Sequence, residues 1–486
     1  MITVTHKGKM YDVEYSIVNV SELEGELRID AEYYEPSYAV YINKVKNCNF
    51  SLLKELQKVP TVNGFDYRKF SDTGVPYVRV GDIKNFTIDL DSSVRVNPKI
   101  IPKKITLEKD DILVTRKGTV GEIALIYSES LKNVIISSEI MRLRLDKEKI
   151  NPYFVAVFLN SLYGTAQIRQ SLHGLAFVSI TQDALENVKI PILSDTFQKQ
   201  IQNLVLQSYD EKEKSVSLYK QAEDTLLEEL GLKDWKPKTK KIIIGGKEFE
   251  EEENMSIRNL SEVLKVDRFD ADYWKPKYDE IEKVIKKYKD GYGYLQNLIG
   301  ISKEKIDVRA DILYSYIELA DANSSLGVVE QMTTIMGKEL PSRARMKVRK
   351  GYVIMSSVEG SIDKIALIDS DEDNLVASTG FFVLKEKSLN KETILVLLKA
   401  LSKQYLVREA QGTILTAIPY DSLERVILPY VSREIETKIA SLVQQSHEAR
   451  KKSKELLEIA KRAVEIAIEK NEKEALSYIS KTENKQ

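Results

Sequence analysis

The stretch Ser194–Leu230 reads SDTFQKQIQNLVLQSYDEKEKSVSLYKQAEDTLLEEL, and it decides the fold that we predict for this 486-residue chain. Charged residues flank a narrow stripe in which Ile201, Ser208, Ser215 and Ala222 stand seven residues apart. A repeat of seven is typical of a helix that packs along its length against a partner helix. We therefore predict one long helix here, with a rise of about 1.5 Å per residue.

A second stretch, Ser432–Lys470, carries the same spacing near the end of the sequence. Small residues in both stripes let two backbones approach closely, which favours a pair of helices over a larger bundle. Two unrelated surface helices with solvated charges are the alternative, and four matched positions in a row argue against it. The predicted seam between the helices comprises Ile201, Leu204, Ser208, Ser215, Leu218, Ala222, Ile439, Leu442, Ser446, Ser453, Leu456 and Ala460.

The rest of the chain also repeats. Arg28–Tyr38 reads RIDAEYYEPSY and Arg268–Tyr278 reads RFDADYWKPKY, at an offset of 240 residues (28 to 268). Before each motif, a β-rich run with a glycine at its centre, Gly8 or Gly246, predicts a hairpin. Each copy thus consists of a hairpin, a mixed α/β globule and a long helix. Tandem duplication is the simplest reading of this order.

The predicted architecture is α+β. Two pseudo-symmetric mixed α/β globules are separated by two long helices, which form an antiparallel coiled coil. In the first globule we predict helices at 39–47 and 152–162 and strands at 75–83, 112–115 and 134–145. In the second we predict helices at 279–289 and 393–401 and strands at 314–321, 352–356 and 376–384.

Composition bounds the class of protein. A hydrophobic content of 43% with 30% charged residues is ordinary for a globular chain of two to four domains. No apolar run reaches the roughly 18 residues of a membrane helix, so we expect a cytoplasmic protein without membrane contact. One cysteine and three scattered histidines argue against disulfides, a metal cluster and a catalytic triad. A net charge of −1 neither favours nor excludes nucleic acid.

Three sequence motifs resemble catalytic sites, but each is better explained as a structural feature. Asn151-Pro152-Tyr153-Phe154 is better explained as a helix N-terminus with proline in the first turn. Lys117–Gly121 lacks the spacing of a phosphate loop and predicts a hairpin turn. The pair Asp110-Asp111 is expected to lie in a solvated turn. We therefore predict that the chain is not an enzyme and binds no metal or cofactor of its own.

Cations instead gather at matching places in the two copies, in the spans 95–117 and 338–350. Two basic runs on a pseudo-symmetric molecule can contact successive faces of one DNA duplex. Lysine-rich solvated loops are the alternative for any single residue. The candidate DNA-binding residues are Arg68, Arg79, Lys99, Lys103, Lys104, Arg116, Lys117, Gln182, Arg343, Arg345, Lys347 and Arg349.

Several segments of the first copy closely resemble the DNA-specificity subunit of type I restriction-modification systems. They include VPYVRVGDI (75–83), DDILVTRKGTVGEIALI (110–126), ISSEIMRLRL (136–145) and GLAFVSITQDALENVKIPI (174–192). The resemblance spans the whole first copy and, more loosely, the second. Ser356–Gly360 replaces Thr115–Gly118 there, and Glu318 replaces Arg79.

The resemblance implies two target recognition domains, each reading one half of a split site in double-stranded DNA, on helices that set the gap between half-sites. It further implies docking of two DNA adenine methyltransferase subunits, with restriction or translocase subunits as further candidates. S-adenosylmethionine, ATP and Mg²⁺ would then bind those partners. The implied domains are 1–193 (recognition domain 1), 194–232 (spacer helix 1), 233–430 (recognition domain 2, with a linker at 233–245) and 431–482 (spacer helix 2).

Two other functions remain open from the sequence. The chain could itself be a DNA methyltransferase or nuclease with disguised motifs, in which case the isolated protein should bind S-adenosylmethionine. It could also be a coiled-coil adaptor that binds only protein, in which case it should show no salt-dependent affinity for DNA.

Overall fold

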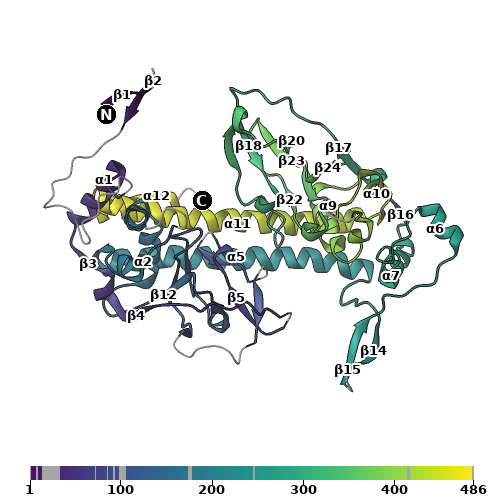
Figure 1. The fold of residues 1–486 in the computed structure, drawn as a ribbon, viewed down its shortest axis with the longest axis horizontal. Coiled ribbons are helices and arrows are strands. Elements are labelled where there is room, and N and C mark those ends of the chain that lie inside the picture. The colour runs from purple at the N-terminus through teal and green to yellow at the C-terminus, as the bar shows by residue number, and fades with distance from the viewer. Residues whose placement is uncertain are drawn as a thin grey trace. The chain divides into compact units, whose positions relative to one another are not determined.

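The computed structural model describes residues 2–6, 9–13, 33–71, 73–84, 86–90, 93–97, 105–172, 178–244, 247–412 and 416–483. It divides into two compact units, residues 1–210 with 452–486 and residues 211–451. Both boundaries fall inside long helices, α5 (Asp195–Leu230) and α11 (Arg433–Glu469), so each helix contributes one half to each unit (Figure 1).

Unit 1 (residues 1–210 and 452–486) contains a four-stranded sheet in the order β10-β9-β12-β4 and a three-stranded sheet in the order β11-β5-β8. A short pair, β13·β3, precedes α5, and β6 pairs with β7. The bounds are β3 Phe50–Leu52, β4 Gln57–Asn63, β5 Val75–Val78, β6 Ile83–Lys84, β7 Thr87–Ile88, β8 Val94–Val96, β9 Ile112–Thr115, β10 Ile123–Leu125, β11 Ile135–Ile136, β12 Ile140–Leu145 and β13 Lys189–Pro191.

Unit 2 (residues 211–451) contains the four-stranded sheets β17-β24-β21-β22 and β19-β18-β23-β20 and the short pair β16·β25. The bounds are β16 Tyr292–Tyr294, β17 Ile299–Ser302, β18 Leu313–Ile317, β19 Thr333–Met336, β20 Ala344–Lys347, β21 Val353–Ser356, β22 Ile365–Leu367, β23 Leu375–Ser378, β24 Phe381–Glu386 and β25 Ile427–Pro429.

The two units share one topology, except that among the described strands the β6·β7 pair occurs only in unit 1 and β20 only in unit 2. The sheet order β10-β9-β12-β4 corresponds strand for strand to β22-β21-β24-β17, with the central strands β9 and β21 offset by 241 residues (112 to 353). In the other sheet, β5 pairs in parallel with β11 and antiparallel with β8, as β18 pairs with β23 and β19. Such agreement confirms the predicted duplication of a mixed α/β body.

Helices cover the sheets at equivalent places in each unit. In unit 1, α2 is buried along its whole length, and Asn151 caps it by accepting a hydrogen bond from the Tyr153 backbone, with Pro152 in the first position. The sequence prediction of a helix N-terminus is thus confirmed. The bounds are α1 Pro36–Lys46, α2 Pro152–Leu159, α3 Leu162–Gln170, α4 Gln182–Glu186, α6 Leu260–Val266, α7 Pro276–Lys286, α8 Leu295–Leu298, α9 Lys391–Ser402, α10 Tyr420–Glu424 and α12 Glu472–Glu483.

Several predicted elements are interrupted in the structure. The strands predicted at 75–83 and 314–321 end at Val78 and Ile317 and are followed by 3-10 turns. The strand predicted at 134–145 is two strands, because β11 pairs with β5 in one sheet whereas β12 pairs with β9 in the other. The strand predicted at 376–384 divides in the same way into β23 and β24. The segment 431–482 is likewise two helices, since α11 ends at Glu469 and α12 begins at Glu472.

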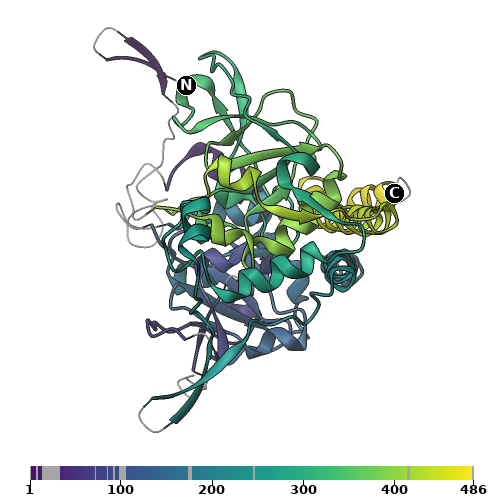
Figure 2. The ribbon, with the colours of Figure 1, turned by 90° about the vertical axis from the view of Figure 1, so that its right-hand side faces the viewer.

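Within each unit, α5 and α11 lie side by side (Figure 2). In unit 1, the Ser208 hydroxyl donates to the Ser453 carbonyl oxygen at 2.8 Å. In unit 2, the Ser446 hydroxyl donates to the Ser215 carbonyl oxygen at 2.7 Å. From Ser208 to Ser215 the chain advances along α5, whereas the partner serine moves back along α11 from Ser453 to Ser446. The two helices therefore run antiparallel. Leu218 and Leu442 are half-buried, and the other ten predicted seam residues are buried.

A second contact joins each long helix to its own globule. In unit 1, the Tyr209 hydroxyl donates to the Phe86 carbonyl oxygen at 3.0 Å, and its ring stacks on Tyr127 with centroids 3.8 Å apart. In unit 2, Nε2 of His447 lies 3.2 Å from the Leu326 carbonyl oxygen. Tyr209 and His447 are 238 residues apart, and Phe86 and Leu326 are 240 residues apart. Both offsets match that of the internal repeat, so the two contacts are equivalent.

Two hairpins were expected ahead of the globules. β1 (Ile2–His6) pairs with β2 (Lys9–Val13), and β14 (Thr239–Ile244) pairs with β15 (Lys247–Glu252), which confirms both. Their turn glycines, Gly8 and Gly246, and the first part of the RIDAEYYEPSY motif lie outside the described residues. Across the described helices, none combines the length and the apolar character that a membrane crossing requires.

Candidate nucleic-acid interface

Three loops of unit 1 meet at the end of β9 where the chain leaves the sheet. The Arg116 backbone N–H donates to the Glu139 carbonyl oxygen at 2.8 Å, and the Ile180 N–H donates to the Arg116 carbonyl oxygen at 3.1 Å. Lys117 forms an isolated antiparallel bridge with Ser179. We call this arrangement the three-loop junction, formed in unit 1 by residues 116–117, 137–139 and 179–180.

Unit 2 contains the same junction at residues 357–358, 378–380 and 417–418. The Ser357 N–H donates to the Gly380 carbonyl oxygen at 2.9 Å, and the Ile418 N–H donates to the Ser357 carbonyl oxygen at 2.8 Å. Val358 forms the antiparallel bridge with Ala417. All three backbone contacts of unit 1 therefore recur at equivalent positions.

The side chains at these positions differ between the two units. Arg116 and Lys117 in unit 1 are replaced by Ser357 and Val358 in unit 2. Lys117 is exposed, and the half-buried Arg116 donates from Nη1 to the Ser138 carbonyl oxygen at 3.4 Å, while its Nε has no hydrogen-bond partner among the described residues. One backbone framework therefore presents two chemically different surfaces.

Arg79 also lies close to the junction of unit 1. It precedes the short 3-10 turn Val80–Asp82, and Val80 lies 3.7 Å from the position that a Cβ on Gly118 would occupy. Its guanidinium is exposed and lies 3.6 Å from the carboxylate of Asp82. Glu318 precedes the equivalent turn Leu319–Asp321, which confirms the predicted match between Arg79 and Glu318.

Two other candidates take separate places in unit 1. Gln182 begins α4, is half-buried, and donates from Nε2 to the Thr61 carbonyl oxygen at 3.2 Å. Its amide is therefore partly occupied by the protein itself. Arg68 lies on the loop after β4 with an exposed guanidinium 3.6 Å from the carboxylate of Asp66. Lys99, Lys103 and Lys104 lie outside the described residues.

The basic run of unit 2 is more neutralised than its sequence indicates. Arg343 lies 3.6 Å from Glu318, and Arg349 lies 3.4 Å from Glu304. Arg345 is half-buried on β20 and donates to the Ala344 carbonyl oxygen, while Lys347 at the end of β20 is half-buried. Glu304 and Glu318 approach this run from distant parts of the chain.

The opposite end of β9 also corrects a prediction. Asp111 was expected in a solvated turn, but it is 1% exposed and accepts two hydrogen bonds from Arg144, each 2.8 Å long. Asp110 accepts a hydrogen bond from the Tyr153 hydroxyl at 2.8 Å and contacts Lys147. Burial, together with this hydrogen bond and the charge of Asp110, raises the pKa of Tyr153 well above its usual range.

Burial also affects charged groups near the junction of unit 1. Glu122 lies between Gly121 and β10, and desolvation raises the pKa of its carboxyl, partly offset by the charge of Lys84. Arg142 on β12 is 4% exposed where the aligned residue of unit 2 is the buried Val383. Desolvation, followed by repulsion from Arg144, lowers the pKa of Arg142.

The described residues contain no group of three or more His, Cys, Asp or Glu side chains placed to hold a metal ion. Sequence reasoning missed two features. The first is the contact that Tyr209 and His447 make between a long helix and its globule. The second is the loop 137–139, which lies inside a predicted strand. Tyr209 and His447 stand at equivalent positions of the two copies, and this correspondence in the sequence could have pointed to them.

Comparison with known proteins bears on the same part of the chain. The profile of the type I restriction modification DNA specificity domain matches residues 46–216. The HindI type I restriction enzyme specificity subunit of Haemophilus influenzae is 25% identical over 111 residues, which are 22% of this chain and 24% of that protein. The EcoBI specificity subunit of Escherichia coli is 28% identical over 149 residues, which are 30% of this chain and 31% of that protein. The chain thus matches less than a third of the length of these relatives.

Solved structures that match this chain include the S subunit of a type I restriction-modification system from M. genitalium, with a TM-score of 0.40 and 16% identity, covering 86% of this chain and 95% of that one. Another is the HsdS subunit from Thermoanaerobacter tengcongensis, with a TM-score of 0.29 and 16% identity, covering 87% of this chain and 97% of that one.

Proposed function

We infer that this chain, whose residues 46–216 match the profile of the type I restriction modification DNA specificity domain, is the non-catalytic DNA-specificity subunit of a type I restriction-modification complex. One observation supports this inference above the others. The same three-loop junction occurs in both units on the same topology, with different side chains in each. A protein that reads two different half-sites with one duplicated scaffold requires this combination.

The chemistry of the two junctions fits two different half-sites. In unit 1, Arg79, Arg116 and Lys117 offer donors to phosphate oxygens and to the acceptor edge of guanine. In unit 2, Glu318 offers an acceptor, which suits the amino group of cytosine. We propose that each unit reads its half-site mainly through these junction loops.

The partners follow from the proposed function. We propose that DNA adenine methyltransferase subunits, two of them, dock on the helices, and that they bind S-adenosylmethionine. Restriction or translocase subunits, which would use ATP and Mg²⁺, are the other proposed partners. A cytoplasmic location fits this assignment, because DNA is the proposed ligand.

We propose that α5 and α11 set the gap between the half-sites. The support comes from their antiparallel pairing, seen in unit 1 at Ser208 and Ser453 and in unit 2 at Ser215 and Ser446. Because α5 and α11 each continue from one unit into the other, their length is a natural ruler. The proposed domains, 1–193, 194–232, 233–430 and 431–482, keep the boundaries predicted from the sequence.

Equilibrium binding of the purified chain to duplex DNA at several salt concentrations tests the proposal. We expect log K to fall linearly with log salt, with a slope close to the number of phosphates contacted. Affinity that does not depend on salt would favour the protein-only adaptor. Binding of S-adenosylmethionine by the isolated chain would favour the methyltransferase alternative.

A further inference from the structure

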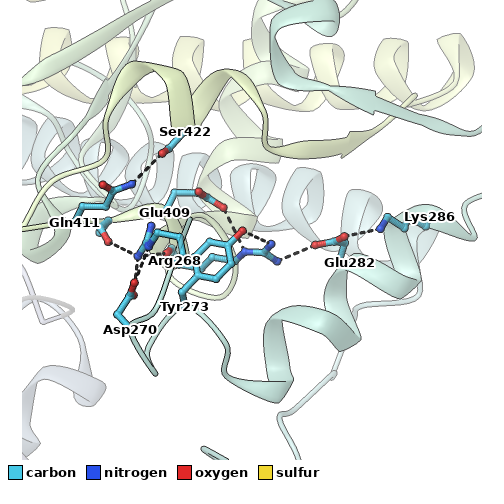
Figure 3. A network of polar contacts seen from close by, with 10 residues as sticks. Arg268, Asp270, Tyr273, Glu282, Lys286, Glu409, Gln411 and Ser422 are labelled. Atoms are coloured by element: carbon cyan, nitrogen blue, oxygen red, sulfur yellow. Dashed lines mark hydrogen bonds and ion pairs between the residues drawn. The ribbon is translucent and has the colours of Figure 1, made fainter. Parts of the chain in front are cut away.

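A polar cluster in unit 2 brings residues of the repeated motif RFDADYWKP next to Glu409 and Gln411 (Figure 3). The ring of Tyr273 lies between two guanidinium groups, with the Cζ of Arg268 at 4.6 Å and the Cζ of Arg408 at 4.5 Å from its centroid. All three residues belong to unit 2. The motif therefore contacts η10 (Leu406–Glu409), the short 3-10 helix that follows α9.

Arg268 ties the motif to the backbone after η10. Its side chain is 10% exposed, and Nη2 donates to the Ala410 carbonyl oxygen at 3.0 Å and to the Arg408 carbonyl oxygen at 3.5 Å. Asp270 holds the same guanidinium through two hydrogen bonds of 2.7 Å. A bidentate fork of this kind fixes the direction of the remaining N–H groups.

Arg408 extends the cluster to α7. Nη2 donates to the Tyr273 hydroxyl at 2.8 Å, and Nη1 donates to the carboxylate of Glu282 at 2.8 Å. Burial raises the pKa of Glu282, but hydrogen bonds from Lys286 and Arg408 outweigh it and leave the pKa below its ordinary value. For Glu409, by contrast, burial dominates and raises the pKa.

Only a few hydrogen bonds separate this cluster from the junction. Gln411 and Ala417 exchange backbone hydrogen bonds of 2.7 and 2.9 Å, immediately after Ala410. Ala417 in turn forms the bridge with Val358. The side chain of Arg268 thus holds Ala410, one residue before Gln411. The bridge between Gln411 and Ala417 in turn leads to the junction of unit 2.

Unit 1 repeats part of this arrangement. Nε2 of Gln170 donates to the Tyr33 carbonyl oxygen at 3.0 Å. Tyr33 corresponds to Tyr273 at an offset of 240, and Gln170 corresponds to Arg408 at an offset of 238. The repeated motif therefore contacts the same part of the globule in both copies.

We propose that Arg268 and Tyr273 are positioning residues for DNA reading: by holding Arg408 and Ala410, they set the register of the Gln411–Ala417 bridge and with it the junction of unit 2. This inference rests on the proposed function. Neither residue is required to contact DNA, so their loss should alter sequence preference in one half-site rather than general affinity.

Selection of bound duplexes from a random library tests the inference with the full-length chain. In Arg268→Gln, we expect discrimination among bases in one half-site to fall about tenfold. Discrimination in the other half-site and the salt dependence should match the wild type. Arg258→Gln is the matched control, because Arg258 also lies over an aromatic ring, Trp274 at 4.8 Å, but bonds to Asp279 instead of the chain near Ala410.

The possible results distinguish failure of the proposed function from failure of the positioning role. A wild-type chain that binds all duplexes equally would contradict the proposed function itself. A wild-type chain that discriminates while Arg268→Gln discriminates equally well would contradict only the positioning role. Equal loss in both half-sites would also overturn it, since that result indicates a merely structural defect.

Amide hydrogen exchange provides a second measurement that does not depend on DNA. In Arg268→Lys, which keeps the charge but loses the fork, we expect faster exchange at the Gln411 and Ala417 amides. Amides of α9 should exchange as in the wild type. Unchanged exchange at Gln411 and Ala417 would contradict the proposal.

Discussion

At the residue scale, the two units keep backbone contacts and exchange side chains. Arg116 and Ser357 make the same two backbone hydrogen bonds, yet one carries a cation and the other a hydroxyl. Backbone donors and acceptors that are paired within the protein hold the loop without depending on the side chain. The side chain is therefore free to differ between units.

Lys117 provides a direct test at this scale. Because it is exposed and its bridge to Ser179 uses only the backbone, Lys117→Ala should leave the fold intact. We expect weaker binding to all duplexes and a salt slope smaller by about 1. Lys147→Ala is the control, since Lys147 lies near the opposite end of β9 beside Asp110. An unchanged salt slope in Lys117→Ala would exclude a phosphate contact.

Arg116→Ala should behave differently. Its half-buried guanidinium is held in one direction by the Ser138 carbonyl oxygen, so we expect its remaining Nη donors to contact a base edge. Loss of one such contact costs about 1–3 kcal/mol of discrimination at one position. Competition binding with single-base variants of the selected half-site measures this. Equal weakening against every variant would instead indicate a phosphate contact.

His447 makes the stability of unit 2 depend on pH. Burial lowers the pKa of its imidazole from 6.5, partly offset by the Leu326 carbonyl oxygen and the charges of Asp369 and Glu392. The unfolded chain then binds a proton at a higher pH than the folded chain does. Stability should therefore be complete above pH 6.5 and fall as the pH drops through the lowered pKa.

His447→Tyr is the matched variant, because Tyr209 makes the equivalent contact in unit 1. We expect this variant to lose the part of the acid sensitivity that His447 causes. Urea unfolding of both proteins between pH 7.5 and 5 measures the difference. Parallel pH profiles for the wild type and the variant would contradict the role of His447.

At the scale of elements, periodicity was a sufficient guide to the long helices and to most strands. It failed at 134–145, where Ser137-Ser138-Glu139 separates two strands that belong to different sheets, with β11 paired to β5 and β12 paired to β9. A run of alternating residues does not say which partner strand each part will meet. The site was predictable only in part for the same reason. Arg79 and Arg116 are distant in sequence, and the acids Glu304 and Glu318 reach the second basic run through tertiary packing.

The helix seam offers a prediction at this scale. Ser208 is 1% exposed and its hydroxyl bonds to Ser453, so Ser208→Leu should overpack the seam and destabilise the protein by about 1–3 kcal/mol. Ser217→Leu is the control, because Ser217 lies on the same helix but is exposed. Urea unfolding compares the two free energies. A Ser208→Leu variant as stable as Ser217→Leu would argue against close packing.

At the scale of the whole molecule, the two units are copies of one fold, and the internal repeat in the sequence predicted this. Their shared strand order explains why one set of junction contacts appears twice. The sequence could not indicate which bases each unit reads, because readout depends on loop geometry, water and DNA shape.

The ruler role of the helices is testable by insertion. Seven residues placed between Glu211 and Lys212 and seven more between Ala449 and Arg450 keep the antiparallel register of the serine pairs. At about 1.5 Å per residue and 3.4 Å per base pair, we expect the preferred gap to lengthen by about three base pairs. The half-site sequences should stay the same. An unchanged gap would reject the ruler role.

Selection of bound duplexes from a random library by the purified wild-type chain tests the central claim most directly. A duplicated recognition scaffold predicts two short, dissimilar motifs separated by a constant number of unspecified base pairs. Recovery of one continuous motif, or of motifs at freely varying separation, would contradict it.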